Sequence, residues 1–260
     1  MMKILKSNYQ IILFVLLIGF MIFLDQSNIE WSKNTLASAM IENSILRFFG
    51  GVIFIVLLCS YGYGWLFKFT SPFIALLVII PGVIIAINNF PISAYFNGRT
   101  TIIEPTYNIY LFLVESLSVG FFEEIIFRGL VLVLLIEKLG KKSNGLLKAI
   151  IISASIFSLI HIINIFDGAS IGNTVLQIGY SFLIGLLFAV LYLKTKNLWL
   201  IMILHALYNF FGQVMFQVGT VTNRYDTITI VLTITFGILT AIYGVYLYIM
   251  IKDKPFLPEV

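Results

Sequence analysis

Apolar runs long enough to cross a lipid bilayer recur along this chain of 260 residues. A helix needs about 20 predominantly apolar residues to span the hydrocarbon core. Charged residues make up only 11% of the chain and hydrophobic residues 60%, whereas soluble domains contain roughly 25% charged residues. A soluble helical bundle of this composition would expose far too much apolar surface. The sequence therefore predicts an all-α, polytopic bundle of membrane helices.

Eight segments are candidate spans. They cover residues 9–24, 46–67, 72–88, 107–137, 147–164, 174–193, 198–217 and 228–251. The first could pass for a signal peptide, but no small-residue cleavage motif follows it, so we interpret it as a span. The fourth would extend over roughly 46 Å, against a hydrocarbon core of about 30 Å, so we expect it to tilt, to break near Gly120 or Gly129, or to leave the membrane. The polar, turn-rich segment 88–105 is typical of a surface or re-entrant connection.

The basic residues are distributed unequally between the two membrane sides of the predicted bundle. With the N-terminus placed in the cytoplasm, the cytoplasmic segments hold Lys3, Lys6, Lys68, Lys138, Lys141, Lys142, Lys148, Lys194, Lys196, Lys252 and Lys254. The outer segments hold Lys33, Arg47, Arg99 and Arg224, and Arg128 lies within a span. Cytoplasmic loops of membrane proteins carry such an excess of lysine and arginine. We therefore expect both termini in the cytoplasm. The net charge of +4 follows from this bias and indicates no nucleic-acid partner.

The run FFEEIIFR, from Phe121 to Arg128, places two glutamates and an arginine inside an apolar helix. Each such charge costs about 2.5 to 3.5 kcal/mol at the helix centre on insertion scales. Glu124 and Arg128 are four residues apart and can pair on one helix face. Glu123 projects about 100° away from Glu124. The sequence thus predicts that Arg128 neutralises Glu124 and that Glu123 serves another purpose.

The two histidines of the chain both lie in predicted spans. His161 follows Phe157 by one helical turn, and Asn209 follows His205 by one turn on the same face. A lone histidine in an apolar helix is usually structural, but ionisable groups inside a bilayer normally face the bundle interior and mark function. We therefore expect both histidines, Asn209 and Glu123 to meet at one site.

The segments EEIIFR, FSLIH and HALYN fit the patterns EExxxR, FxxxH and HxxxN, in this order on successive predicted helices. Together they resemble the CPBP family of intramembrane proteases, the CAAX protease and bacteriocin-processing group that is also called the Abi family. The resemblance covers residues 107–217. It implies a CPBP/CAAX-protease-like catalytic core at 107–217, flanked by N-terminal helices in 1–106 and by a C-terminal helix and tail in 218–260, all in one membrane domain.

Peptide hydrolysis requires a base that activates water and donors that stabilise the oxyanion. Glu123 is the candidate base, and His161 could share the water with it. His205 and Asn209 could both donate to the oxyanion. This division matches what the family resemblance implies. Glu124, Arg128 and Phe157 would then support the catalytic residues without touching the substrate.

The same side chains are also compatible with a zinc-dependent mechanism. Glu123, His161 and His205 match a known catalytic zinc set with water in the fourth position, and the family is often called metalloproteases on those grounds. Asn209 suits an oxyanion donor better than a zinc ligand, so we prefer the route that requires no cofactor and keep zinc as the alternative. The segment GASIG around Ser170 fits the G-x-S-x-G pattern of serine hydrolases. It lies in a short loop between two predicted helices, not on the strand-to-helix turn that this motif needs.

Our leading hypothesis is an intramembrane endopeptidase of a bacterial cell membrane. Its substrate would be a hydrophobic peptide at the lipid bilayer, lipidated or bacteriocin-like, in bacteriocin processing or self-immunity. The alternatives are a non-catalytic immunity or scaffold protein of the same fold, and a small transporter with Glu123 and His161 as a proton relay. The transporter does not explain the paired His205 and Asn209. We expect the catalytic site to lie at mid-membrane depth or beyond, and this depth is compatible with a cavity that opens to either face of the membrane.

Overall fold

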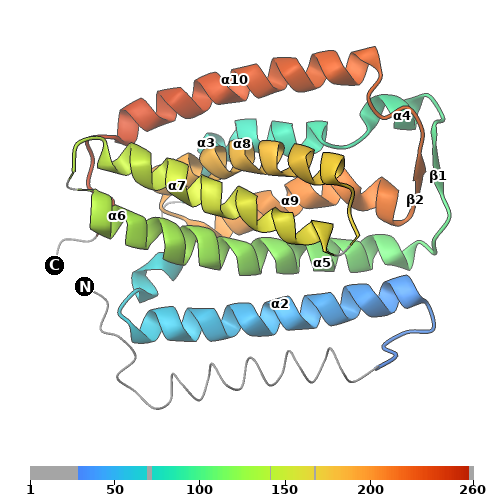
Figure 1. Cartoon of the computed structure of the whole chain (residues 1–260), viewed down its shortest axis with the longest axis horizontal. Helices are drawn as coiled ribbons and strands as arrows, with labels where there is room; N and C mark the ends of the chain where they lie inside the picture. Colours follow the sequence, from blue (N-terminus) through green and yellow to red (C-terminus); the bar gives the residue numbers. More distant parts are fainter. Residues whose placement is uncertain (1–28, 69–71, 141, 167, 258–260) are drawn as a thin grey trace.

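The computed structural model describes residues 29–68, 72–140, 142–166 and 168–257, and the first predicted span, 9–24, lies outside them. Long helices run side by side, with a small sheet at one end of the bundle (Figure 1). In chain order the elements are α2 (Thr35–Ser60), η1 (Gly64–Phe67), α3 (Pro72–Asn88), α4 (Ile92–Phe96), β1 (Thr100–Ile102), α5 (Tyr107–Glu124), η2 (Ile125–Leu132), α6 (Val133–Leu139), α7 (Gly145–Leu159), η3 (Ile160–Ile165), α8 (Ile171–Thr195), α9 (Leu198–Gln217), β2 (Gly219–Val221) and α10 (Thr227–Ile251). Of the short elements, η1 and η3 are 3₁₀ helices and η2 is a π-helix.

The predicted helical membrane bundle is confirmed, but the predicted number of about eight spans is not. Five of the described helical segments are long and apolar enough to cross a membrane: Thr35–Ser60, Gly145–Ile165, Ile171–Thr195, Leu198–Gln217 and Thr227–Ile251. Helix α3 is apolar but shorter, and α5 carries three glutamates. A described helix nevertheless occupies each of the seven predicted segments after the first.

Helix α2 corrects one predicted boundary. It begins at Thr35, not at residue 46, because the side chain of Asn34 caps its first turn and accepts the backbone N–H of Ala37 at 2.8 Å. Such a cap satisfies one of the N–H groups that the first helical turn leaves without a partner. Arg47, which we expected in an outer segment, therefore lies in the middle of α2. Its guanidinium Nη1 pairs with Oε1 of Glu115 at 3.1 Å, and this pairing offsets part of the cost of placing either charge there.

The long fourth segment is continuous helix from Tyr107 to Leu139, through α5, η2 and α6. It does not break at Gly120 or at Gly129; Gly129 instead lies inside the π-helix. A π-helical turn widens the helix locally and is frequent at functional sites. Here it begins directly after Glu124, within the EExxxR motif.

A small sheet that the sequence did not predict accompanies the helical bundle. Strands β1 and β2 pair antiparallel, with Thr101 opposite Thr220, and the hydroxyls of these two threonines hydrogen-bond at 2.6 Å. Gly219 allows the strands to meet, because a Cβ there would lie against the carbonyl oxygen of Thr101. Strands of three residues carry too little alternation to be recognised in a sequence. The segment 88–105, expected as a surface or re-entrant connection, contains α4 and β1.

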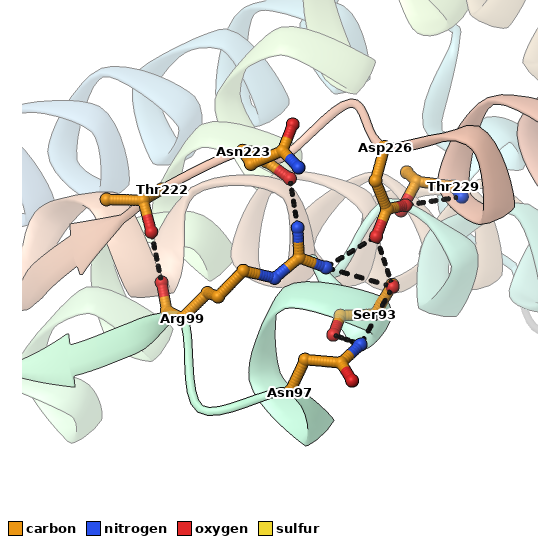
Figure 2. A network of polar contacts seen from close by, with 7 residues as sticks. All are labelled: Ser93, Asn97, Arg99, Thr222, Asn223, Asp226 and Thr229. Atoms are coloured by element: carbon orange, nitrogen blue, oxygen red, sulfur yellow. Dashed lines mark hydrogen bonds and ion pairs between the residues drawn. The ribbon is translucent and has the colours of Figure 1, made fainter.

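A polar network beside the sheet ties the start of α10 to α4 (Figure 2). Arg99 forms an ion pair with Asp226 through Nη2 and donates from Nη1 to the carbonyl of Asn223 at 3.1 Å. The hydroxyl of Ser93 donates to the same oxygen of Asp226, Oδ2. The other oxygen, Oδ1, caps α10 by accepting the backbone N–H of Thr229 at 2.9 Å.

Helices α5 and α9 pack directly against each other beside the site. A Cβ at Gly120 would lie against the carbonyl oxygen of Met202 and the backbone nitrogen of Ala206, so the two backbones touch there. Small residues at helix contacts permit this approach in membrane proteins. Helix α2 packs on α5, α3 packs on α9, and α7 packs on α8. The contact at Gly120 lies one helical turn before Glu124 on α5 and directly beside His205 on α9.

Candidate active site

The four side chains that we predicted as catalytic line one cavity of about 300 Å³. Glu123 comes from the end of α5, His161 from η3, and both His205 and Asn209 come from α9. Phe157 of α7 also lines the cavity. Four separate elements thus deliver the residues of the three motifs to one place, as the sequence predicted.

Glu124 and Arg128 form the predicted ion pair, with Arg128 Nη1 donating to Glu124 Oε1 at 2.6 Å. Both side chains are buried. Arg128 is held further by the carbonyl of Gly185, 3.4 Å from its Nη2, and by the ring of Phe157, whose centroid lies 4.5 Å from the guanidinium carbon. A buried charge needs such partners, since an unpaired one costs several kcal/mol.

Glu124 also contacts His205, which the sequence did not predict. Nδ1 of His205 lies 2.7 Å from Oε1 of Glu124. Because the carboxylate can only accept a hydrogen bond, this contact assigns a proton to Nδ1 and leaves Nε2 to face the cavity. Nε2 lies 3.8 Å from Oε2 of Glu123. No local sequence pattern predicts this contact, because it joins residues of two different helices.

His161 is oriented by its own backbone. Its Nδ1 lies 3.1 Å from the carbonyl oxygen of Phe157 and 3.3 Å from that of Ser158. A carbonyl oxygen only accepts, so Nδ1 carries the proton and Nε2 is the free acceptor of the neutral ring. The ring of Phe157 lies between both histidines, in edge-on contact with His161 at 5.5 Å and with His205 at 5.8 Å between centroids.

Glu123, His161 and Asn209 are the half-buried members of the site, whereas His205 is buried. The side chain of Glu123 is 28% exposed, whereas that of His205 is 5% exposed. Asn209 is half-buried and lies one helical turn beyond His205. The separation of the two glutamates is therefore as predicted: Glu124 is buried in the ion pair, and Glu123 faces the cavity.

The rest of the cavity wall is mostly polar. Glu115 also lines the cavity. The amide nitrogen of Asn164 donates to Gln177 Oε1 at 2.8 Å, which bridges η3 and α8. The hydroxyl of Ser116 is buried, lines the cavity and has no hydrogen-bond partner among the described residues. Sequence reasoning missed Asn164 and Ser116, since lone small polar residues in membrane helices are common.

The three residues of the predicted zinc set, Glu123, His161 and His205, all line the cavity. Zinc needs its nitrogen and oxygen ligands at about 2.0 to 2.2 Å. In the part of the chain that the structure describes, no three side chains of His, Cys, Asp or Glu come together closely enough to hold a metal.

Comparison with known proteins identifies residues 105–211 as a match to the family described as type II CAAX prenyl endopeptidase Rce1-like. The matched segment contains all three motifs, and the predicted resemblance to the CPBP/CAAX protease family is confirmed. Neither a curated protein nor a solved structure matches the chain.

Proposed function

We propose that this chain, whose residues 105–211 form an Rce1-like type II CAAX endopeptidase domain, cleaves peptides within the membrane by activating water without a metal. The observation that supports this proposal is the relation between Glu123 and His205. The accessible carboxylate faces the Nε2 atom of a histidine whose other nitrogen is fixed by Glu124. A candidate base and a candidate hydrogen-bond donor thus line the same cavity.

Glu123 is the general base in this mechanism. It removes a proton from water while the water oxygen attacks the scissile carbonyl carbon. His161 accepts the second hydrogen of the same water through Nε2, because its Nδ1 is bound to backbone carbonyls. Glu123 then passes the abstracted proton to the leaving amine. This reaction requires both side chains to face a space that holds water.

Asn209 and His205 stabilise the tetrahedral oxyanion. The side-chain amide of Asn209 donates directly. His205 can donate from Nε2 only as an imidazolium, since its Nδ1 proton is directed to Glu124. With two carboxylates and one guanidinium beside it, an imidazolium makes the cluster of Glu123, Glu124, Arg128 and His205 electrically neutral. A neutral cluster is the less costly state in a low-dielectric interior.

The substrate that suits this cavity is a peptide segment with its polar backbone exposed. Glutamine, asparagine and tyrosine side chains along the wall offer hydrogen bonds to an extended chain. A bacteriocin-like or other membrane-associated peptide has this character. A lipid chain attached to the peptide would remain in the bilayer, because most of the side chains that line the cavity are polar.

Mass spectrometry of membrane-associated peptides tests the activity. Cells that express the chain are compared with cells that express Glu123→Gln, which keeps the shape of the side chain but removes the base. Glu42→Gln is the matched control, because Glu42 lies on α2 and does not line the cavity. We expect cleavage products that disappear in Glu123→Gln and persist in Glu42→Gln.

The same experiment separates catalysis from binding. A non-catalytic immunity or scaffold protein would give the same peptides in all three strains, and its phenotype would survive the Glu123→Gln change. Equal membrane levels of the three proteins, checked by immunoblot, are the condition for this comparison. Retained products in Glu123→Gln would overturn the proposed role of the base.

A further inference from the structure

We infer that the cavity opens toward the extracytoplasmic side of the cell membrane, so that a substrate peptide reaches Glu123 from outside. Only the identity of the substrate rests on the proposed function; the direction of the opening does not. The inference combines two observations: the charge at each end of the bundle, and the end toward which the cavity wall extends.

The two ends of the bundle differ strongly in basic residues. We call the end with β1 and β2 the sheet end, and the opposite end, where α6, α8 and α10 terminate, the lysine end (Figure 1). Among the described residues, the lysine end carries Lys68, Lys138, Lys142, Lys148, Lys194, Lys196, Lys252 and Lys254. The sheet end carries Lys33, Arg99 and Arg224. Because an excess of basic residues marks the cytoplasmic side, the sheet end faces outward.

The cavity wall extends from the catalytic residues toward the sheet end. Asn164 lies in η3, Gln177 lies in the second turn of α8, and Gln217 is the last residue of α9. Figure 1 shows that the end of α7 and the start of α8 point toward the sheet end, and that α9 leads directly into β2. Gln213 and Gln217 are exposed, and Tyr180 is 41% exposed. The cavity wall thus becomes more exposed to solvent from Glu123 toward the sheet end.

The bundle is closed on the other side of the site. Arg128, Phe188 and Leu132 lie toward the lysine end from His205 and are buried. The guanidinium of Arg128 reaches from η2 to the carbonyl of Gly185 on α8 and is covered by the rings of Phe157 and Phe188. This packed layer separates the cavity from the cytoplasmic side, so an entry for water and peptide remains at the sheet end.

Cysteine accessibility tests the inference directly, because the chain has a single cysteine, Cys59, which is replaced by alanine as background. Thr222→Cys marks the sheet end, and Lys142→Cys marks the lysine end. Gln177→Cys reports on the cavity wall, with Gln213→Cys as its replacement if that variant fails to reach the membrane. Bacterial cells carrying each variant are treated with a membrane-impermeant maleimide, intact and after permeabilisation.

We expect Thr222→Cys and the cavity cysteine to be labelled equally in intact and permeabilised cells, and Lys142→Cys to be labelled only after permeabilisation. The reverse pattern at the two end markers would overturn the orientation. Labelling of Thr222→Cys without labelling of either cavity cysteine in intact cells would overturn the opening. Labelling needs no catalysis, so repeating it in Glu123→Gln distinguishes a wrong opening from a wrong reaction.

Discussion

Nδ1 of His205 and Oε1 of Glu124 lie 2.7 Å apart across the contact between α5 and α9. The same oxygen accepts a hydrogen bond from Arg128 at 2.6 Å. The buried carboxylate of Glu124 therefore holds both the Arg128 guanidinium and the His205 imidazole in place. The position of His205 in the cavity depends on this oxygen and on the spacing of the two helices.

Removal of the Glu124 carboxylate should separate its stabilising and its positioning roles. Glu124→Ala leaves Arg128 buried without a countercharge, and breaking a buried pair costs about 3 to 5 kcal/mol. We expect a clear loss of thermal stability in detergent and loss of cleavage. The double variant Glu124→Leu with Arg128→Met removes both charges, so stability should largely return.

Cleavage should not return in that double variant, because His205 still lacks the partner of its Nδ1. Full activity of the double variant would contradict the positioning role of Glu124. Thermal unfolding followed by intrinsic fluorescence, together with peptide cleavage in proteoliposomes, gives both readouts.

Gly120→Ala should disturb the site from one helical turn before Glu124, on the same face of α5. The new methyl group would press on the backbone of α9 at Met202 and Ala206, and overpacking of this kind costs about 1 to 3 kcal/mol. We expect reduced stability and a lower kcat, since the distance between Glu124 and His205 would change. Gly179→Ala is the control, because a Cβ there meets nothing within 4 Å. Equal behaviour of the two variants would contradict the close helix contact.

Asn209→Ala should lower kcat more than it raises KM. The loss of one oxyanion donor typically reduces kcat by about 10² to 10³, and the amide does so only if it contacts the transition state. Asn209→Asp keeps the size but places a carboxylate opposite the oxyanion, so it should be at least as slow. Steady-state kinetics with a cleaved peptide measure both. A change confined to KM would assign Asn209 to substrate binding.

Removal of metals should leave the activity intact. The protein is purified, its zinc content is measured by mass spectrometry, and cleavage is assayed after incubation with a chelator. We expect less than stoichiometric zinc and unchanged rates, because no described set of side chains fits a metal ion. Stoichiometric zinc, with activity lost on chelation and recovered on readdition, would establish the metal route through Glu123, His161 and His205.

Asp226 should make the stability of the folded protein depend on pH. The Ser93 hydroxyl, the Thr229 backbone N–H and the Arg99 guanidinium hold the pKa of the Asp226 carboxyl well below its ordinary value. A lowered pKa in the folded state stabilises the protein above the unfolded pKa of about 3.9, and this contribution is lost as the pH falls toward the folded pKa.

Asp226→Asn should therefore melt at a lower temperature than the parent at neutral pH, and the difference should shrink below about pH 4. Asp253→Asn, at the exposed lysine end, serves as the control and should change little. Unfolding of the detergent-solubilised protein between pH 7 and pH 3 gives the comparison. A difference that stays constant over this range would exclude the network as its origin.

The sequence determined the parts of the site that depend on one helix alone. Glu124 and Arg128 were predicted to pair because a helix places residues four apart on one face, and the same rule placed Asn209 beside His205. The cost of charges in lipid marked Glu123, His161 and His205 as functional before any contact was known. Apolar runs also located seven helical segments that the structure describes, although Asn34 starts α2 earlier than the run suggested.

Tertiary structure alone decided the contacts between elements. The bond from Glu124 to His205, the pair of Arg47 with Glu115 and the sheet of β1 with β2 each join residues far apart in the chain. Periodicity fixes which face of a helix is apolar, but the rotation and distance of two helices follow from packing, here from the backbone contact at Gly120. The end of the bundle toward which the cavity extends likewise emerges only when the helices are assembled.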